Sequence, residues 1–193
     1  EILNAWVAVS EIVKTRGKRS SRVITSAIVL STLAFGNLSI AGPPGVNELP
    51  TGGVVAAGNA SISQTTNTMT IQQATQRAVL DWNTFNIGQN ATVNINQLDA
   101  SSVLLNNILG NNPSQIYGAL NANGQVFLSN PSGFYFSPSS SVNVGGLVAT
   151  TGTMSTHDFM AGSNRFTEGN NKSAVINEGL LQSGLGGYIA LLA

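Results

Sequence analysis

The stretch from residue 121 to residue 150 reads NANGQVFLSNPSGFYFSPSSSVNVGGLVAT, a pattern of short strands joined by turns. Apolar residues alternate with polar ones, and β-branched and aromatic side chains are frequent, as in strands with one buried face. We predict a strand over residues 125–129 and the next one over residues 134–136. In residues 141–146, which read SVNVGG, valines alternate with asparagine, so the same pattern continues.

Two turns separate these predicted strands, and their residues have defined stereochemical preferences. Asn123-Gly124 is a dipeptide typical of tight turns. Asn130-Pro131-Ser132-Gly133 has Asn at the first position, Pro at the second and Gly at the fourth, which a type I turn favours. In most proteins such a sequence only turns the chain, so these residues by themselves predict structure rather than function.

Outward from this stretch, short alternating apolar runs recur over residues 51–193. Between residues 93 and 144 the runs begin roughly eight to thirteen residues apart, with Asn, Gly, Pro and Ser between them. A β-sandwich, a β-barrel and a solenoid all fit that spacing. The residues expected to form much of the core are Val93, Ile95, Val103, Leu105, Val126, Leu128, Phe134, Phe136, Val142 and Val144.

Composition slightly favours the solenoid. In a parallel β-helix the stacked coils align equivalent turn positions, so asparagines can form amide ladders and few charges are needed. Asp, Glu, Lys and Arg make up 8% of the 193 residues, against roughly 25% in a typical soluble domain. The length suits one domain with a substantial core.

Charge and cysteine content exclude several classes of function. The formal net charge is zero, which argues against nucleic-acid binding because phosphate recognition needs clustered Lys and Arg. The chain has no cysteine, which excludes a disulfide framework, a thiolate metal site and cysteine catalysis.

Residues 1–41 differ from the rest of the chain. They hold five basic and two acidic side chains, a formal charge of +3, whereas residues 42–193 have −3. The basic cluster precedes residues 23–35, thirteen residues without a charge, and then the small residues Ser39 and Ala41. This order is typical of a secretory signal peptide, with cleavage between Ala41 and Gly42. As a helix the apolar run would span about 20 Å, too short for the ~30 Å hydrocarbon core, so a membrane anchor is the weaker interpretation. A buried helix that caps the domain is another alternative.

The leader and the segment that follows it have contrasting patterns. Ile2, Trp6, Val9 and Val13 recur at helical spacing, so an N-terminal helix is expected in the leader. Residues 42–50 read GPPGVNELP, without periodicity and with three prolines, which predicts a linker or an extended first strand. The predicted organisation is a leader over 1–41, this linker, and a β domain over 51–193.

Residues that could carry catalysis are few. The six acidic side chains of residues 42–193 are at least ten residues apart in sequence and lie in no recognisable motif. Glycoside hydrolysis, for comparison, needs two carboxyl groups within about 5 to 9.5 Å of each other. His157, the only histidine, is interpreted as a polar partner of Asp158 rather than as a catalytic base. We therefore expect no enzyme, no metal site and no cofactor. The alternative is a secreted β-helix carbohydrate-active enzyme or a carbohydrate-binding module.

Several segments together carry a family resemblance. Residues 123–136 (NGQVFLSNPSGFYF), followed by residues 142–150 (VNVGGLVAT), resemble the core signature of the filamentous-haemagglutinin-type secretion domain of two-partner secretion exoproteins of Gram-negative bacteria. WNTFNIG at 82–88, NPSQIYG at 112–118 and GGYIALL at 186–192 agree with it. The leader resembles the extended signal peptide of large autotransporters and two-partner exoproteins.

The resemblance implies an all-β domain folded as a right-handed parallel β-helix. Export would use the Sec machinery and then a dedicated outer-membrane β-barrel transporter with periplasmic receptor domains. The protein would be secreted or stay at the cell surface, and any host-surface or carbohydrate ligand would bind a region downstream. Transporter recognition or the folding nucleus would involve Asn112, Pro113, Asn130, Pro131, Ser132, Gly133, Asn143, Gly145 and Gly146.

The sequence stops at residues 191–193, directly after a predicted strand. An exposed last coil would leave an unpaired apolar edge. We therefore expect that the natural protein continues or that a partner covers this end.

Overall fold

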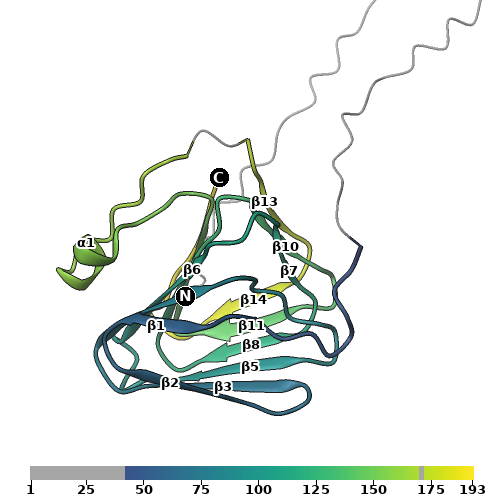
Figure 1. The fold of residues 1–193 in the computed structure, drawn as a ribbon, viewed down its shortest axis with the longest axis horizontal. Helices are drawn as coiled ribbons and strands as arrows, with labels where there is room; N and C mark the ends of the chain where they lie inside the picture. Colours follow the sequence, from purple (N-terminus) through teal and green to yellow (C-terminus); the bar gives the residue numbers. More distant parts are fainter. Residues whose placement is uncertain (1–41, 170–171) are drawn as a thin grey trace, which may run out of the picture. The chain divides into compact units, whose positions relative to one another are not determined.

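The computed structural model describes residues 42–169 and 172–193, and strands make up nearly all the regular structure in that part of the chain (Figure 1). The predicted leader helix, the apolar run 23–35 and Ala41 of the cleavage site lie outside the described residues. In chain order the elements are β1 (Val54–Ala57), β2 (Ala60–Gln64), β3 (Thr68–Gln73), β4 (Arg77–Trp82), β5 (Thr92–Asn96), β6 (Val103–Ile108), β7 (Ser114–Ile116), β8 (Ala119–Ala122), β9 (Gln125–Ser129), β10 (Phe134–Phe136), β11 (Ser141–Val144), β12 (Gly146–Thr150), α1 (Thr156–Met160), β13 (Val175–Asn177), β14 (Leu180–Ser183) and β15 (Ile189–Leu192).

The strands form three sheets. Sheet I has the order β1-β4-β6-β9-β12-β15, sheet II has the order β2-β3-β5-β8-β11-β14, and sheet III has the order β7-β10-β13. From β5 onward the chain visits sheet II, then sheet I, then sheet III, and repeats the circuit. Each circuit is one coil, and Figure 1 shows the strands of sheet II stacked one above the next.

Successive coils pair in parallel and in register. On sheet II, Val93 lies opposite Leu120, and Leu120 lies opposite Val142. The other pairs from β3 onward are parallel as well, which confirms the prediction for most of the domain. The strands predicted over 125–129 and 134–136 agree with β9 and β10 residue for residue.

The first strands depart from the parallel pattern. β2 runs antiparallel to β3, with Ile62 opposite Ile71, and β1 runs antiparallel to β4, with Val55 opposite Leu80. Antiparallel strands can be joined by a short loop, whereas parallel strands need a long crossover. The polar loop of residues 65–67 therefore joins β2 and β3 in a hairpin at this end of the coils.

The ten residues expected in the core are all buried. Eight of them fill the inside of the coils, together with aromatic side chains such as Trp82 and Phe85. Val103 and Leu105 face outward from sheet I instead, because Leu104 between them takes the inward position. This run is continuously apolar because both faces of sheet I are buried.

An excursion of the chain covers the outer face of sheet I. Residues 151–169, between β12 and β13, leave the coil and include α1. The ring of Phe159 packs against that of Phe127 with centroids 6.1 Å apart, and the ring of Phe166 lies 5.9 Å from Phe127. The excursion thus removes from water an apolar surface that a bare coil would expose.

Arg77 on β4 holds this excursion in place. Its Nε donates a hydrogen bond to the carbonyl oxygen of Phe159 at 2.7 Å, and Nη2 donates to Oδ1 of Asn164 at 2.6 Å. The guanidinium carbon lies 4.0 Å from the centroid of the Phe159 ring, a cation–π geometry. One side chain therefore makes polar and aromatic contacts with the same segment.

Residues 42–50 contain no strand but pack against the coils. Leu49 joins the core, and Pro50 is buried beside it. The carbonyl oxygen of Gly42 accepts a hydrogen bond from Nε2 of Gln115 at 3.2 Å. This segment therefore lies along the domain that follows it.

Candidate functional site

The residues Asn130-Pro131-Ser132-Gly133 form the predicted turn between β9 and β10. The backbone N–H of Gly133 donates to the carbonyl oxygen of Asn130 at 2.9 Å, which closes the turn. Oδ1 of Asn130 accepts a second hydrogen bond, from the N–H of Ser132 at 2.9 Å. Gly133 has φ +100°, a conformation that favours glycine.

Asn130 also connects this turn to the coil before it. Its side chain is fully buried, and Nδ2 donates to the carbonyl oxygen of Asn112 at 3.1 Å and to Oγ of Ser114 at 2.9 Å. Asn112 and Pro113 are exposed in the loop between β6 and β7, at the equivalent corner of that coil. The structure thus brings together the two Asn-Pro segments that the sequence singled out.

A hollow lies beside these turns. Its volume is about 300 Å³, and half-buried Pro131 and Ser132 form part of its wall. Leu109, which follows β6, lines the same hollow and has a side chain that is 65% exposed. Met154 of the excursion lines it as well. The hollow therefore combines apolar side chains with polar groups at the corner between sheets I and III.

Asn143, Gly145 and Gly146 lie elsewhere, around the corner between sheets II and I. The N–H of Gly145 donates to the carbonyl oxygen of Gly124 at 2.8 Å, so the predicted turn at Gly124 stacks beneath Gly145. A Cβ on Gly145 would come within 2.8 Å of that same carbonyl oxygen, which explains the need for glycine. The candidate residues therefore form two groups at two corners.

Some residues of the first corner were not predicted. Leu109 and Met154 carry no motif that distinguishes them from ordinary loop residues, and Ser114 lies in the NPSQIYG segment but was not among the candidate site residues. Asn106 has a buried amide whose Oδ1 accepts from Nε1 of Trp82 at 3.0 Å. Asn106 directly follows the apolar residues 103–105, and this position is the one sequence signal that it faces the core.

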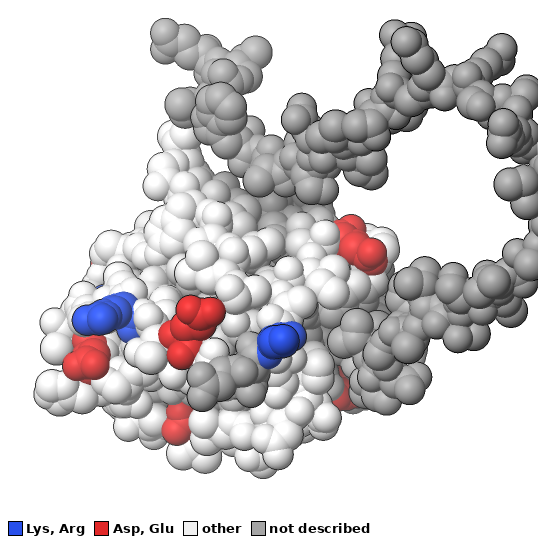
Figure 2. Space-filling model, turned by 90° about the horizontal axis from the view of Figure 1, so that it is seen from above, with Lys and Arg blue, Asp and Glu red and all other residues white. Residues whose placement is uncertain are grey.

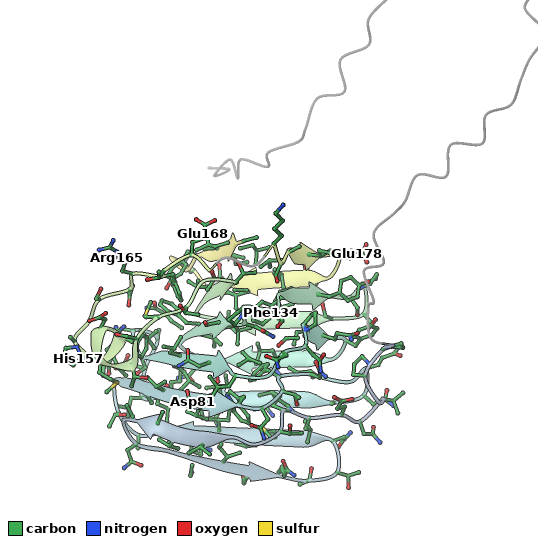
Figure 3. The ribbon with its side chains drawn as sticks, turned by 45° about the horizontal axis from the view of Figure 1, so that its top comes forward. Asp81, Phe134, His157, Arg165, Glu168 and Glu178 are labelled. Atoms are coloured by element: carbon green, nitrogen blue, oxygen red, sulfur yellow. The ribbon has the colours of Figure 1, made fainter. Side chains whose placement is uncertain are left out.

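Charged side chains do not converge on one another among the residues that the structure describes. Nδ1 of His157 lies 3.4 Å from Oδ1 of Asp158, and both side chains are mostly exposed. Within residues 42–169 and 172–193 no group of three or more His, Asp or Glu could hold a metal ion. In Figure 3 the labelled residues Asp81, His157, Glu168 and Glu178 lie at separate places on the molecule.

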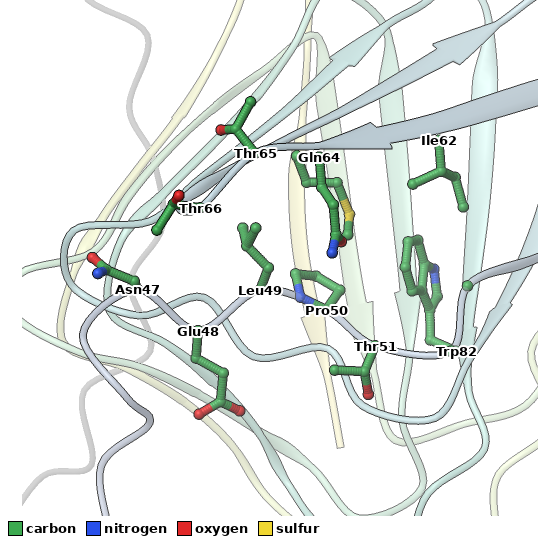
Figure 4. Close-up of a pocket in the computed structure, with 13 residues that line it drawn as sticks. Asn47, Glu48, Leu49, Pro50, Thr51, Ile62, Gln64, Thr65, Thr66 and Trp82 are labelled. Carbon is green, nitrogen blue, oxygen red and sulfur yellow. The ribbon is translucent and has the colours of Figure 1, made fainter.

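A second hollow lies near the β2–β3 hairpin (Figure 4). It has a volume of about 640 Å³, and Leu49, Ile62, Met69 and Trp82 give it apolar walls. Glu48 is the one acidic residue in its lining, and its carboxylate accepts hydrogen bonds from Nδ2 of Asn86 at 2.8 Å and from the N–H of Gly45 at 2.9 Å. Both carboxylate oxygens of Glu48 therefore accept hydrogen bonds that stabilise the loop around it.

The surface is weakly charged. The face shown in Figure 2 is mostly uncharged, with single Lys, Arg, Asp and Glu side chains scattered over it. No helix in the described part of the chain is long and apolar enough to cross a bilayer. The geometry is therefore that of a stacked β domain whose turns and hollows offer polar and apolar contact surfaces.

Comparison with protein families identifies the domain. Residues 47–193 match the family model of the TPS (two-partner secretion) secretion domain. The chain belongs to this family. Residues 1–40 match the model of the extended signal peptide of the type V secretion system, so both parts of the predicted resemblance are confirmed.

Known proteins agree with this assignment of the TPS domain. The crystal structure of the HMW1 secretion domain from Haemophilus influenzae matches with a TM-score of 0.68 and 31% identity, over 74% of this chain and 38% of that one. A heme/hemopexin-binding protein of H. influenzae Rd is 38% identical over 158 residues, which are 81% of this chain and 17% of that protein. A second H. influenzae protein of that name is 39% identical over 124 residues, 64% of this chain and 13% of its own length.

The TPS domain is the secretion module of a two-partner exoprotein. Its extended signal peptide directs Sec export, and its partner is a cognate outer-membrane transporter. The exoprotein passes through the periplasm and is secreted or displayed at the cell surface. These matches point to a secretion domain and not to an enzyme.

Proposed function

We propose that the TPS domain presents the hollow beside Asn130 to its transporter, and that Leu109, Pro131 and Ser132 are the residues recognised there. The observation that carries this proposal is the exposure of Leu109, a large apolar side chain that is 65% exposed in a concave surface. Apolar side chains that seat in desolvated pockets supply much of the binding energy of protein interfaces.

In this proposal Asn130 and Gly133 act by building the surface rather than by touching the transporter. Both are buried, so neither offers a side chain to a partner. Asn112 and Pro113 are exposed beside the same corner and extend the contact. Gly145 and Gly146 belong to the other corner, where their backbone stacks on the preceding coil and contributes to folding, and Asn143 lies beside them with an exposed side chain.

The test compares two exposed leucines. Leu109→Ser changes the wall of the hollow, whereas Leu98→Ser changes a leucine that is 59% exposed on a different loop. Neither side chain is in the core, so we expect the free energy of unfolding to change by less than about 0.5 kcal/mol in either variant. In cells that carry the transporter, the yield of secreted protein should fall about tenfold or more for Leu109→Ser and stay unchanged for Leu98→Ser.

Secretion of the two leucine variants in equal yield would contradict this proposal. A fall in secretion that both variants share, with unchanged unfolding, would indicate that the export route is sensitive to any exposed polar substitution. Urea unfolding of each purified variant separates these outcomes from a loss of stability.

We also propose that the signal peptidase removes residues 1–41 by cleavage between Ala41 and Gly42. Residues 42–50 then lead into the β domain of residues 51–193. The extended-signal-peptide match to residues 1–40 supports this boundary. Mass spectrometry of the secreted protein should give a mass that begins at Gly42, and a mass that includes residues 23–35 would contradict the proposal.

We propose, finally, that the coils wind in the right-handed sense and that the TPS domain nucleates β-helix folding after export. Periplasmic receptor domains of the transporter would hold it until then. The in-register stacking of coils supports this role, because each coil can act as the template for the next. Adhesive or toxic activity would reside outside this chain, whose match covers 17% of its relative.

A further inference from the structure

Sheet II exposes a face without charged side chains. Its strands β2, β3, β5, β8, β11 and β14 consist entirely of uncharged residues. On the outward face, one polar residue from each strand lies in register with the next, and together they form a continuous row that we call the polar column. Its members are Ser63, Thr70, Asn94, Asn121, Asn143 and Gln182.

The middle of the polar column is already ordered. Nδ2 of Asn121 donates to Oδ1 of Asn94 at 3.0 Å, and both side chains are half-buried. Side chains that are held in place lose little rotamer freedom when they bind a ligand. Asn143 and the neighbouring Asn96 are exposed and make no side-chain hydrogen bond to any residue that the structure describes. Their amide donors and acceptors therefore face solvent.

A shallow hollow runs beside the polar column. Its volume is about 410 Å³, which lies in the range of ligand sites. Its polar lining consists almost entirely of amides: Thr70, Asn94, Asn96, Asn121, Asn123 and Asn143. A ligand in this hollow would meet hydrogen-bonding groups of both kinds and no ionic charge.

We propose that the polar column binds a neutral, β-linked glycan that lies across the strands. Neighbouring strands are about 4.8 Å apart, close to the advance per sugar in an extended β-linked chain, so each strand can offer a group to one sugar. An amide presents two donors and an acceptor side by side, as adjacent hydroxyl groups require. Acidic glycans and nucleic acids would need cations, which this face lacks.

The polar column is distinct from the hollow at Leu109. That hollow lies at the corner between sheets I and III, whereas the column lies on the outer face of sheet II. A substitution can therefore abolish glycan binding without affecting transporter recognition, and the reverse. Variants of the column should be secreted normally, and Leu109→Ser should bind glycan normally.

The test uses the protein collected from the culture medium of cells that carry the transporter. The probe is cellohexaose, a neutral β-linked glucose hexamer, and dextran sulfate is the charged control. By calorimetry, cellohexaose should bind with an affinity that added salt does not change, and dextran sulfate should not bind. Asn94→Ala and Asn121→Ala should each weaken binding about tenfold.

Three further variants complete the design. Asn143→Lys should abolish binding, because a long charged side chain would fill the hollow. Asn96→Lys, two residues after Asn94 on β5, should abolish binding for the same reason. Asn59→Ala, at an exposed asparagine between β1 and β2 that lines neither hollow, is the matched control and should bind like the wild type. Circular dichroism checks that each variant is folded.

Several results would overturn the proposal. They are a wild-type protein that does not bind cellohexaose, binding that survives both lysine substitutions, and binding of dextran sulfate that salt weakens. Dimers in sedimentation that Asn143→Lys dissociates, without any glycan binding, would also overturn it by showing that a second copy occupies the column.

Discussion

The side-chain amide of Asn130 donates a hydrogen bond to the backbone carbonyl oxygen of Asn112, 3.1 Å away, although the two residues belong to successive coils. The same nitrogen lies 2.9 Å from Oγ of Ser114, and Oδ1 of Asn130 accepts from the N–H of Ser132 at 2.9 Å. One buried amide therefore shapes its own turn and also holds the turn of the preceding coil.

The first prediction concerns Asn130→Ala. This change removes three hydrogen bonds and leaves the buried hydroxyl of Ser114 without this partner, so the free energy of unfolding should fall by about 2–3 kcal/mol. Val126→Ala, a core change, should cost about 2 kcal/mol. Urea unfolding measures both. Because Asn130 is buried, the secreted yields of the two variants should follow their stabilities, and a much larger loss of secretion for Asn130→Ala would mean that the transporter reads this residue directly.

Gly133→Ala should be more disruptive than an ordinary glycine substitution. The residue has φ +100°, and a Cβ would come within 2.5 Å of the carbonyl oxygen of Ala174. Strain and clash together should lower stability by about 3 kcal/mol. Gly162→Ala is the matched control, since φ is +89° there but no atom lies within 4 Å. It should cost about 1 kcal/mol, and equal costs in urea unfolding would contradict the role of the Ala174 contact.

Arg77→Ala should release the excursion of residues 151–169 from sheet I. It removes the hydrogen bonds to Phe159 and Asn164 and the cation–π contact, at a cost of about 2 kcal/mol. Hydrogen exchange in α1 should accelerate, and Arg77→Lys should have nearly the same effect because an ammonium group cannot reproduce the two-pronged contact. Arg165→Ala, at an exposed position of the excursion, should leave exchange unchanged.

Alkaline pH should weaken the contact between Tyr135 and Glu178. The Tyr135 hydroxyl donates to Oε2 of Glu178 at 2.5 Å, and this hydrogen bond raises the pKa of Tyr135 to about 12. Because the pKa in the folded state lies above that of the unfolded chain, the stabilisation is complete below about pH 10 and is lost as the pH rises through 12. Burial also raises the pKa of Tyr188, so the measurement compares wild type with Tyr135→Phe. The variant should lose less stability over this range in urea unfolding.

Local patterns in the sequence were sufficient to predict most of the strands and the buried positions. The alternation of Val142 and Val144 with polar residues reflects one inward face, and β11 spans Ser141–Val144. The orientation of Val103 and Leu105 could not be predicted in the same way. Both faces of their strand are apolar, and the outer face is buried only because Phe159, far along the chain, packs over it. The periodicity of a strand does not indicate whether a segment distant in sequence packs on its outer face.

The candidate site was predicted in part for a similar reason. Turn stereochemistry identifies Asn130, and the family resemblance identifies Asn112, but the hydrogen bond between them depends on how the coils stack. Leu109 was missed because an exposed leucine after an apolar strand has the same sequence signature as a buried one. Which turns come into contact depends on the number of residues in each coil. The excursion before β13 lengthens one coil, and no repeat in the sequence indicates this change.

The contact of Arg77 with Phe159 has a consequence for how the TPS domain melts. In a stack where each coil touches only its neighbours, the end coils can fray one at a time. Arg77 is on β4 and Phe159 follows β12, so their contact bypasses β6 and β9, which lie between those strands in sheet I. When the coil that contains β4 frays, the contacts of Arg77 with the segment after β12 must therefore break as well. This long-range tie makes the stack cooperative, so heat should unfold the domain in a single transition rather than coil by coil.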